Sequence, residues 1–329
     1  MKRILSVIAV TLITFTTATA QRISVVTENG TTSVFRTLQQ AIEGADPGST
    51  IYLPGGGFSI ADSVKITKRL TIIGIGHKSD NENADGSTII SGNIFFNEGS
   101  SGSAIMSCYI TGNVNIGEGG APVNDVTIKF CNLNGVQVLN STCEETMINQ
   151  NFIRGNSDLG GTIGFIYNNI AYSLSGVKGG RIFYNVITGN VFAYTPGYTR
   201  YYSSIKADDC VISYNILTSR NNAGYLYGNN CTVYNNLTQD EWGDNSQFIG
   251  DTDWSDVFTN YNGAAVNPNT KFHFKDDYSQ YEHQVGIYAG DSFNEGQLAP
   301  VPYIISKDIP QQTDAAGKLN IKIRVKAGD

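Results

Sequence analysis

A short motif recurs along the middle of the chain and limits the folds that the chain can adopt. Each copy reads as an aliphatic residue, two variable residues, Asn and a bulky apolar residue. The Asn positions are Asn151, Asn169, Asn185, Asn215 and Asn236, and Cys131 holds the same place one copy earlier. From Cys131 to Asn236 the steps are 20, 18, 16, 30 and 21 residues, a mean of 21. A fixed period of this size is typical of solenoids, in which each repeat packs only on its neighbours.

The length of the step selects among solenoids. About 21 residues is too short for a βαβ unit, and the apolar positions lack the 3.6-residue period of a helix pair. The step suits one turn of a parallel β-helix, in which each short strand stacks on its equivalent about 4.8 Å away. We therefore predict an all-β, single-stranded parallel β-helix whose interior is filled by the aliphatic members of the motif.

The Asn members are expected to form a ladder at one bend of the solenoid. Asn tolerates the left-handed backbone region, and its amide can donate to one neighbour while it accepts from another. A weaker copy, from Met106 to Ile110, places Tyr109 at the Asn position. The structural reading of this series outweighs a catalytic one.

The five cysteines, Cys108, Cys131, Cys143, Cys210 and Cys231, do not form the dense, even set of a disulfide framework. No Cys/His spacing indicates zinc. Cys210 and Cys231 are separated by one 21-residue step, so we expect both at one stacked position. Parallel side chains in register do not point at each other, so two inward thiols are favoured over a disulfide.

The two ends of the chain differ from the repeats. Residues 1–20 read as a signal peptide: Lys2 and Arg3 precede an apolar run that ends near a small-residue cleavage site before Gln21. Residues 21–60 are expected to form an N-terminal cap with a helix from Val34 to Glu43, which would cover the open edge of the solenoid. Residues 61–299 would form the β-helix with its closing coil. Residues 300–329 would form a β appendage docked on the last coil, because Leu319, Ile321, Ile323 and Val325 alternate with polar residues.

Several segments resemble the pectin-lyase-like superfamily of right-handed parallel β-helix proteins. The opening segments are Leu38–Ile42, Gly48–Pro54, Leu70–Gly76 and Thr88–Gly92, and the segments Phe272–Asp276 and Val285–Gly290 are similar to the closing coil of secreted Bacteroidetes members. The resemblance implies a right-handed β-helix over about residues 30 to 290. It does not imply one activity, since the superfamily includes lyases, hydrolases, adhesins and proteins without a known function.

Composition and motif searches narrow the function. The net charge of −7 and the pI near 5.0 argue against nucleic acid, which requires a basic face. No stretch approaches the roughly 18 apolar residues of a membrane span. The adjacent acidic pair Asp208 and Asp209 lacks the His and Arg-Ile-Lys partners of a polygalacturonase-like hydrolase.

The 30-residue step between Asn185 and Asn215 carries an insertion of roughly ten residues. Insertions in solenoids emerge on one side and often form the binding face. Tyr rings suit the face of a sugar, and Arg or Lys suits a carboxylate. We expect ligand contacts from Tyr194, Tyr198, Arg200, Tyr201, Tyr202, Tyr225 and Tyr227, and the alternative is that these rings pack on the coils. The weak catalytic candidates are Lys206 or Arg200 as a base, with Asp208 and Asp209.

Calcium is the one metal that the sequence leaves open. Asp251, Asp253 and Asp256 could supply oxygen ligands, although the Gly and the distal Glu of an EF-hand loop are missing, and an ordinary acidic turn is the alternative.

Three functions follow from these observations. The first is an exported, monomeric β-helix that recognises polysaccharide or a cell-surface glycan in the periplasm, at the cell surface or outside the cell. The second is a polysaccharide lyase acting on an acidic glycan, and the third is a structural or adhesive solenoid without a sugar site.

Overall fold

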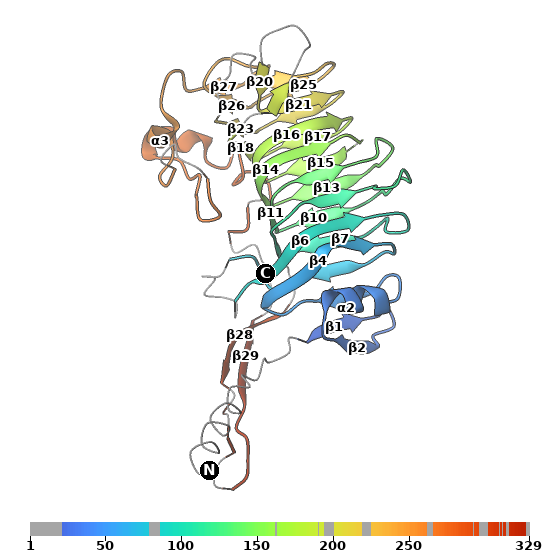
Figure 1. The fold of residues 1–329 in the computed structure, drawn as a ribbon. Coiled ribbons are helices and arrows are strands. Elements are labelled where there is room, and N and C mark those ends of the chain that lie inside the picture. The colour runs from blue at the N-terminus through green and yellow to red at the C-terminus, as the bar shows by residue number, and fades with distance from the viewer. Residues whose placement is uncertain are drawn as a thin grey trace, which may run out of the picture.

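The chain is mostly β, with long parallel sheets (Figure 1). The computed structural model describes residues 22–78, 86–161, 163–189, 191–193, 201–218, 225–261, 266–291, 293–295, 302–308, 310, 312–313 and 316–326. The predicted signal peptide, residues 1–20, lies outside the described residues. No helix among the described residues is long and apolar enough to cross a membrane.

One sheet takes a single strand from each successive repeat. From β3 onward its neighbours pair in parallel. Its strands, in spatial order, are β2 (Thr32–Phe35), β1 (Ile23–Val26), β3 (Thr50–Tyr52), β5 (Thr71–Ile73), β7 (Ala104–Met106), β10 (Thr127–Lys129), β13 (Thr146–Asn149), β15 (Ile163–Tyr167), β17 (Arg181–Phe183), β22 (Val211–Ser213) and β25 (Thr232–Tyr234). We call it the first sheet. The order follows the chain from β3 to β25, as expected of stacked coils.

A second sheet lies beyond the bend that carries the Asn residues, and all its pairings are parallel. Its first set of strands follows the bend directly: β8 (Tyr109–Ile110), β11 (Asn132–Leu133), β14 (Phe152–Leu159), β16 (Ile170–Lys178), β18 (Val186–Ile187), β23 (Ile216–Leu217) and β26 (Leu237–Thr238), with β27 (Gln247–Phe248) at the end. The others are β4 (Gly56–Ile66), β6 (Thr88–Phe96), β9 (Val114–Ile116), β12 (Val136–Val138), β21 (Ile205–Asp208) and β24 (Leu226–Tyr227). These architectural features agree with the predicted all-β solenoid.

The predicted Asn ladder is present, and all five of its Asn side chains are fully buried. Above Asn151, each Oδ1 of the ladder accepts from the backbone N–H and from the Nδ2 of the preceding Asn. The N–H and Nδ2 of Asn169, for example, donate to Oδ1 of Asn185 over 2.9 and 3.0 Å. At the lower end Asn151 Oδ1 accepts from the backbone N–H of Cys131, and at the upper end Ser246 Oγ accepts from the N–H of Asn236. Buried polar groups satisfied in this way are structural, because none is left available to a ligand.

The left-handed residue of each bend is not the ladder Asn, as the sequence analysis supposed, but the residue before it. That residue has φ between +53° and +58° in each of the five bends: Gln150, Asn168, Tyr184, Tyr214 and Asn235. Phe130 and Ser107 take the same conformation before Cys131 and Cys108. Ile105 pairs with Ile128, so Cys108 holds the ladder position in its coil, and the prediction of Tyr109 there is wrong by one residue. Asn is selected at the ladder for its amide and not for its backbone.

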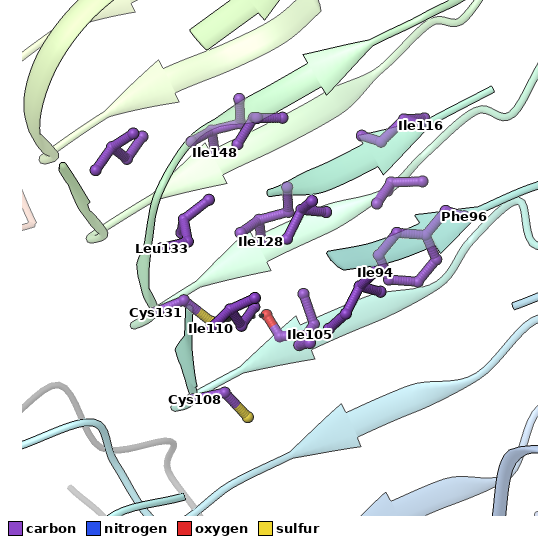
Figure 2. Packing of buried hydrophobic residues seen from close by; sticks show 14 of the residues in the cluster. Ile94, Phe96, Ile105, Cys108, Ile110, Ile116, Ile128, Cys131, Leu133 and Ile148 are labelled. Carbon is purple, nitrogen blue, oxygen red and sulfur yellow. Dashed lines mark hydrogen bonds between the residues drawn. The ribbon is translucent and has the colours of Figure 1, made fainter. Parts of the chain in front are cut away.

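The first aliphatic residue of each motif fills the interior. Ile105, Ile128, Ile148, Ile166, Ile182 and Ile212 are completely buried and stack from coil to coil. Figure 2 shows the first three of them, with side chains from the second sheet such as Ile94 and Ile116 beside them. Burying an Ile side chain contributes about 1.5–3 kcal/mol. Stacked burial of this kind makes the interior one continuous core and confirms the role predicted for these residues.

The bulky residue after the ladder Asn does not join that interior. Phe152, Ile170, Val186, Ile216 and Leu237 belong to a separate buried cluster. A closing segment, residues 249–295, covers them with the buried side chains of Trp254, Val257, Phe258, Phe272, Phe274, Val285, Ile287, Tyr288 and Phe293. Figure 1 shows this segment in orange along one side of the stack, with α3 (Trp254–Val257) in it.

The residue after the ladder position is apolar only in some coils. In the register of the second sheet, Tyr109 and Asn132 precede Phe152, and Asn132 is also buried. The guanidinium of Arg154 lies 4.9 Å from the ring of Tyr109 and donates to the carbonyl of Ile110 at 2.8 Å. From Phe152 onward the side chains at this position belong to the apolar cluster that includes the closing segment.

A cluster of polar side chains connects different parts of the closing segment with one another. His273 lies between two carboxylates, with Nδ1 2.8 Å from Glu282 and Nε2 3.2 Å from Glu295. The ring of Tyr288 stacks on the imidazole at 4.0 Å, and its hydroxyl donates to Glu295. Lys271 forms a 2.7 Å ion pair with Glu295. Side-chain hydrogen bonds join the segment to the bends: Asn168 Nδ2 donates to the carbonyls of Ile287 and Ala289.

All five cysteines are free thiols. Because Val211 pairs with Thr232, the preceding residues Cys210 and Cys231 occupy one stacked position, as predicted. Cys210 is buried and Cys231 is half-buried. Cys131 is fully buried at the ladder position, and its thiol lies 3.2 Å from the carbonyl oxygen of Lys129.

The N-terminal cap contains a shorter helix than predicted. Val34 and Phe35 belong to β2, and α2 spans Leu38–Gly44. Thr37 ends the extended segment and caps the helix, because its side chain accepts from the N–H of Gln40. Leu38, Ala41 and Ile42 are buried, so the apolar face of the helix does cover the first coils.

The C-terminal residues form the predicted two-stranded appendage, in which β28 (Tyr303–Asp308) pairs antiparallel with β29 (Lys322–Lys326). We expected the apolar row of this appendage to be buried on the last coil, but it is exposed. Leu319, Ile321, Ile323 and Val325 are between 45% and 59% exposed. In Figure 1 the hairpin lies near the capped end of the solenoid.

Candidate functional site

The Tyr-rich insertion is only partly described. Tyr194, Tyr198 and Arg200 lie outside the described residues. Tyr201 and Tyr202 belong to β20 (Tyr201–Ser203), which pairs antiparallel with β19 (Val191–Ala193). The proposed ligand contacts of these residues remain predictions.

Tyr225 does not extend the insertion surface in the way that was predicted, and the ligand contact of Tyr227 stays a prediction. Tyr225 is 3% exposed and packs on Trp242, with ring centroids 5.4 Å apart. Its hydroxyl accepts from the backbone N–H groups of Gln239 and Asp240. A ring at that depth belongs to the core, so its assignment as a ligand contact was wrong. Tyr227 lies in β24, next to Lys206 in register.

The weak catalytic candidates are held by the coil that follows them. Lys206 and Asp208 are half-buried on one face of β21, since Ile205 and Ala207, which alternate with them, are buried. Asp208 Oδ1 accepts from the backbone N–H of Asn229 at 2.8 Å. Asp209 Oδ1 accepts from Asn230 Nδ2 at 3.1 Å. These bonds give both carboxylates a structural role between neighbouring coils.

The three candidate calcium ligands do not converge. Asp253 caps α3, and its Oδ1 accepts from the N–H of Ser255 at 2.8 Å, which lowers the pKa of the carboxyl group. Asp251 and Asp256 are exposed. Among the described residues, which include all three, no group of three metal-binding side chains comes together. The acidic turn is thus the better description of this segment.

The structure instead brings together a row of aromatic side chains along the first sheet and the bend that follows it. We call it the aromatic strip. Tyr167, Phe183 and Tyr234 are the last residues of their strands, and Phe165 lies two residues before Tyr167 in β15. Tyr184 and Tyr214 are left-handed residues of the bend. Phe165 is 41% exposed, and the others are half-buried. The strip thus consists of large rings that the solenoid holds partly in solvent.

Stacking between coils orders the strip. The rings of Tyr167 and Phe183 are parallel, with centroids 5.0 Å apart and an interplanar angle of 1°. Tyr184 and Tyr214 lie 5.2 Å apart, and Tyr214 meets Tyr234 edge-on at 5.8 Å. Because the strands fix the spacing, the rings cannot spread apart without breaking the sheet.

Ser213 interrupts the series of aromatic residues at one register position of the first sheet. Tyr167 pairs with Phe183, Phe183 with Ser213, and Ser213 with Tyr234. Ser213 therefore places a small side chain, 5% exposed, where the coils around it carry rings. A hollow of about 220 Å³ lies there, lined by Arg181, Phe183, Tyr184, Val211, Ser213, Tyr214 and Tyr234. The hollow is smaller than the roughly 300–1,000 Å³ of a site for a drug-sized ligand, so it suits a single ring.

Charged groups flank the strip on two sides. Arg181 is exposed at the rim of the hollow. Lys129 is half-buried two coils before Phe165, and burial lowers the pKa of its ammonium while Asp291 opposes that change. Burial raises the pKa of Tyr184, and the neighbouring Tyr214, Tyr234 and Asp291 add to the rise. Tyr184 therefore keeps its proton at neutral pH and can both donate and accept a hydrogen bond.

Sequence reasoning missed the strip because it treated the two positions before each Asn as variable. Those positions read Tyr-Asn, Phe-Tyr, Ser-Tyr and Tyr-Asn in four successive coils. Alternation along a strand places the first of each pair on the outer face. That enrichment in aromatic residues was the available signal.

Comparison of the chain with protein-family models, with curated proteins and with solved structures found no match.

Proposed function

We propose that this chain is an exported, right-handed parallel β-helix protein of the pectin-lyase-like type, similar to secreted Bacteroidetes members, and that it binds polysaccharide through the aromatic strip. The observation that carries the proposal is the hollow at Ser213, which three tyrosines, Phe183 and Arg181 line on a partly exposed face. Carbohydrate binding uses this combination, because sugars present both apolar C–H faces and hydroxyl groups.

The geometry of a solenoid favours a polymeric ligand. Equivalent side chains repeat about every 4.8 Å along the stack, which is comparable to the length of one sugar unit. A glycan lying along the strip could thus meet a similar set of groups at each coil. The Tyr201 and Tyr202 hairpin, in the adjoining insertion, would add contacts at the side of this surface.

We favour binding over catalysis for a specific reason. Asp208 and Asp209 are hydrogen-bonded to Asn229 and Asn230, and in this arrangement they serve the coil contact. A lyase would release an unsaturated product that absorbs in the ultraviolet, so incubation with uronate-containing polymers checks that alternative directly.

Glycan-array binding and affinity electrophoresis in polysaccharide gels test the proposal. The wild-type protein should be retarded by at least one polymer, and the Tyr184→Ala/Tyr214→Ala double variant should lose most of that retardation. Tyr52→Ala is the matched control, because Tyr52 is a 38% exposed tyrosine on β3 of the same sheet and lies outside the strip. A wild-type protein that binds no glycan would overturn the proposal and favour a structural solenoid.

A parallel variant separates the strip from the insertion. If Tyr201→Ala/Tyr202→Ala abolishes binding while Tyr184→Ala/Tyr214→Ala does not, the glycan surface is the insertion and not the strip.

A further inference from the structure

The register of the first sheet leaves a gap in a stack of rings. Phe183 and Tyr234 lie two strands apart, on either side of Ser213. Two strand spacings amount to about 9–10 Å, which leaves room for one ring between two others. The parallel Tyr167–Phe183 pair shows that rings at this register position stack face to face in adjacent coils.

We propose that the gap at Ser213 is a slot that takes one anionic sugar ring of a bound glycan, inserted in the place of the missing side chain. This inference rests on the proposed function and makes it specific: it names the subsite, the orientation of the ring and the charge of the sugar.

The walls and the floor of the slot fit a pyranose. Phe183 and Tyr234 supply apolar surfaces on two sides, which suit the C–H faces of a sugar ring. Ser213 at the floor offers a hydroxyl group, and the hydroxyls of Tyr184 and Tyr214 belong to residues that line the same hollow. The ring oxygen and the hydroxyls of a sugar would therefore find donors and acceptors around an apolar centre.

The charge of the ligand follows from Arg181. Its side chain is exposed at the rim of the hollow, and none of the residues that the structure describes forms an ion pair with it. A guanidinium group binds a carboxylate or a sulfate through paired, charge-assisted hydrogen bonds. An anionic substituent on the inserted ring would give Arg181 a counter-ion in a protein whose overall charge is negative.

The first test fills the slot. Ser213→Phe places a ring at a position where the neighbouring coils carry Tyr167, Phe183 and Tyr234, so the backbone already suits an aromatic residue there. The probes are methyl galacturonoside and methyl galactoside, which differ only in the carboxylate, and binding is followed by NMR titration. We expect the wild-type protein to prefer the galacturonoside and Ser213→Phe to lose about tenfold or more of that affinity. Tyr52→Ala, on the same sheet but outside the strip, is the control and should stay within about twofold.

The second test removes the charge. In Arg181→Gln the affinity for methyl galacturonoside should fall to that of methyl galactoside, while the affinity for the neutral sugar should not change. A galactose 6-sulfate probe decides between carboxylate and sulfate as the natural anion, since both would bind Arg181 but the better fit should bind more tightly. Retention of the acidic preference in Arg181→Gln would overturn the assignment of charge.

The remaining outcomes separate this inference from the proposed function. If the wild-type protein is retarded by a polysaccharide gel, but Ser213→Phe binds both probes as the wild type does, the slot is wrong and the glycan surface stands. The same conclusion follows if the wild-type protein binds the polymer but neither probe. If it binds neither polymer nor probe, both proposals fall. Should Ser213→Phe not fold, Tyr234→Ala removes one wall, and unchanged probe binding in that variant would overturn the slot.

Discussion

Asn185 and Asn215 are thirty residues apart in the chain, yet Nδ2 of Asn185 donates to Oδ1 of Asn215 over 2.9 Å. The longest step between two Asn residues of the ladder lies between these two residues. The ladder bond is nevertheless as short as those between coils without an insertion, such as the 3.0 Å bond from Asn169 to Asn185. The insertion therefore leaves the stacking of the coils intact, which is why a hairpin can be added to this face without a change in the core.

Replacing Asn185 by Ala should be strongly destabilising. The Nδ2 group donates to Ile166 O, Phe183 O and Asn215 Oδ1, and its Oδ1 accepts from Asn169. The variant leaves several of these buried groups without a partner, so we expect a loss of about 3 kcal/mol in the free energy of unfolding, measured by urea titration. Asn134→Ala, at an exposed hydrogen-bonded Asn, should cost less than about 1 kcal/mol. Equal losses for the two variants would contradict the structural role of the ladder.

The ladder should accept an additional Asn at position 131. The backbone N–H of Cys131 already donates to Asn151 Oδ1. The thiol of Cys131 lies 3.7 Å from Ile105 O and 3.2 Å from Lys129 O, and the equivalent carbonyls in later coils accept from Nδ2 of the ladder Asn residues. We expect Cys131→Asn to unfold within about 1 kcal/mol of the wild type. In Cys131→Asp the side chain has nearly the shape of Asn but directs a carboxylate at carbonyl oxygens. The free energy of unfolding should therefore fall by more than about 2 kcal/mol. A stable Asp variant would show that the carbonyls at this position do not require a donor.

The sequence predicts those features that the repeated motif alone determines, and it predicts less well the features that depend on distant segments. The ladder and the stacked interior were predictable, because each coil repeats the same pattern: Ile148, Ile166 and Ile182 must stack once their period is known. The left-handed bend residue was assigned wrongly, since Asn suits both positions of the bend and a single sequence does not say which one needs the amide.

The surface was harder to predict than the core, because exposure depends on segments far away in the chain. Phe152 and Phe183 are both apolar and both point outward, yet Phe152 is buried by residues after position 249 and Phe183 is not. Tyr225 looked like a surface residue, but Trp242 and the backbone of Gln239 enclose it. Nothing in the local pattern distinguishes the buried aromatic residues from the exposed ones. The sequence therefore indicated a site at the insertion, whereas the structure indicates one at the strip.

The buried thiols should resist chemical modification and make the fold sensitive to alkali. Burial raises the pKa of Cys131 to about 12 and that of Cys210 to about 11. At pH 8 a thiol reagent should modify Cys231 alone in the native protein, and all five cysteines in urea, as counted by mass spectrometry. Modification of Cys131 in the native state at a rate similar to that of Cys231 would show that the coils open easily at the ladder.

The same pKa shifts determine how stability changes at high pH. The folded pKa lies above the unfolded value of about 8.5–9, so the thiol contributes its full stability below that pH and loses it as the pH rises toward 11 or 12. Cys131→Asn lacks one such group. Between pH 8 and pH 10 the wild type should therefore lose about 1–2 kcal/mol more than Cys131→Asn, measured by urea titration.

Polar substitution under the closing segment should release it. Ile216 is 1% exposed and belongs to the same buried cluster as Val285 and Ile287. Ile216→Asn buries an amide and removes apolar contact, so a loss of about 3–4 kcal/mol is expected. Hydrogen exchange should increase mainly in residues 249–295. Val34→Asn, at a 54% exposed residue, should change stability by less than about 0.5 kcal/mol.

Glu295 should make the closing segment sensitive to acid. Burial alone would raise the pKa of this carboxyl group, but hydrogen bonds from Lys271, Tyr288 and His273 offset that effect and lower it. A folded pKa below the unfolded value means that the group stabilises the fold above about pH 4.5 and loses that contribution as the pH falls further. Because Glu295 is 36% exposed, water screens the interaction, and we expect only about 0.5–1 kcal/mol from it.

The variant Glu295→Gln tests this contribution, since it keeps the shape and removes the charge. It should be less stable than the wild type at pH 7 and should approach it at pH 3, when stability is measured by urea titration at each pH. Lys271→Gln and the double variant complete a mutant cycle, in which the coupling should be present at pH 7 and absent at pH 3. If the coupling is the same at both pH values, the ion pair does not hold the closing segment, and its stability comes from the apolar cluster around Phe258.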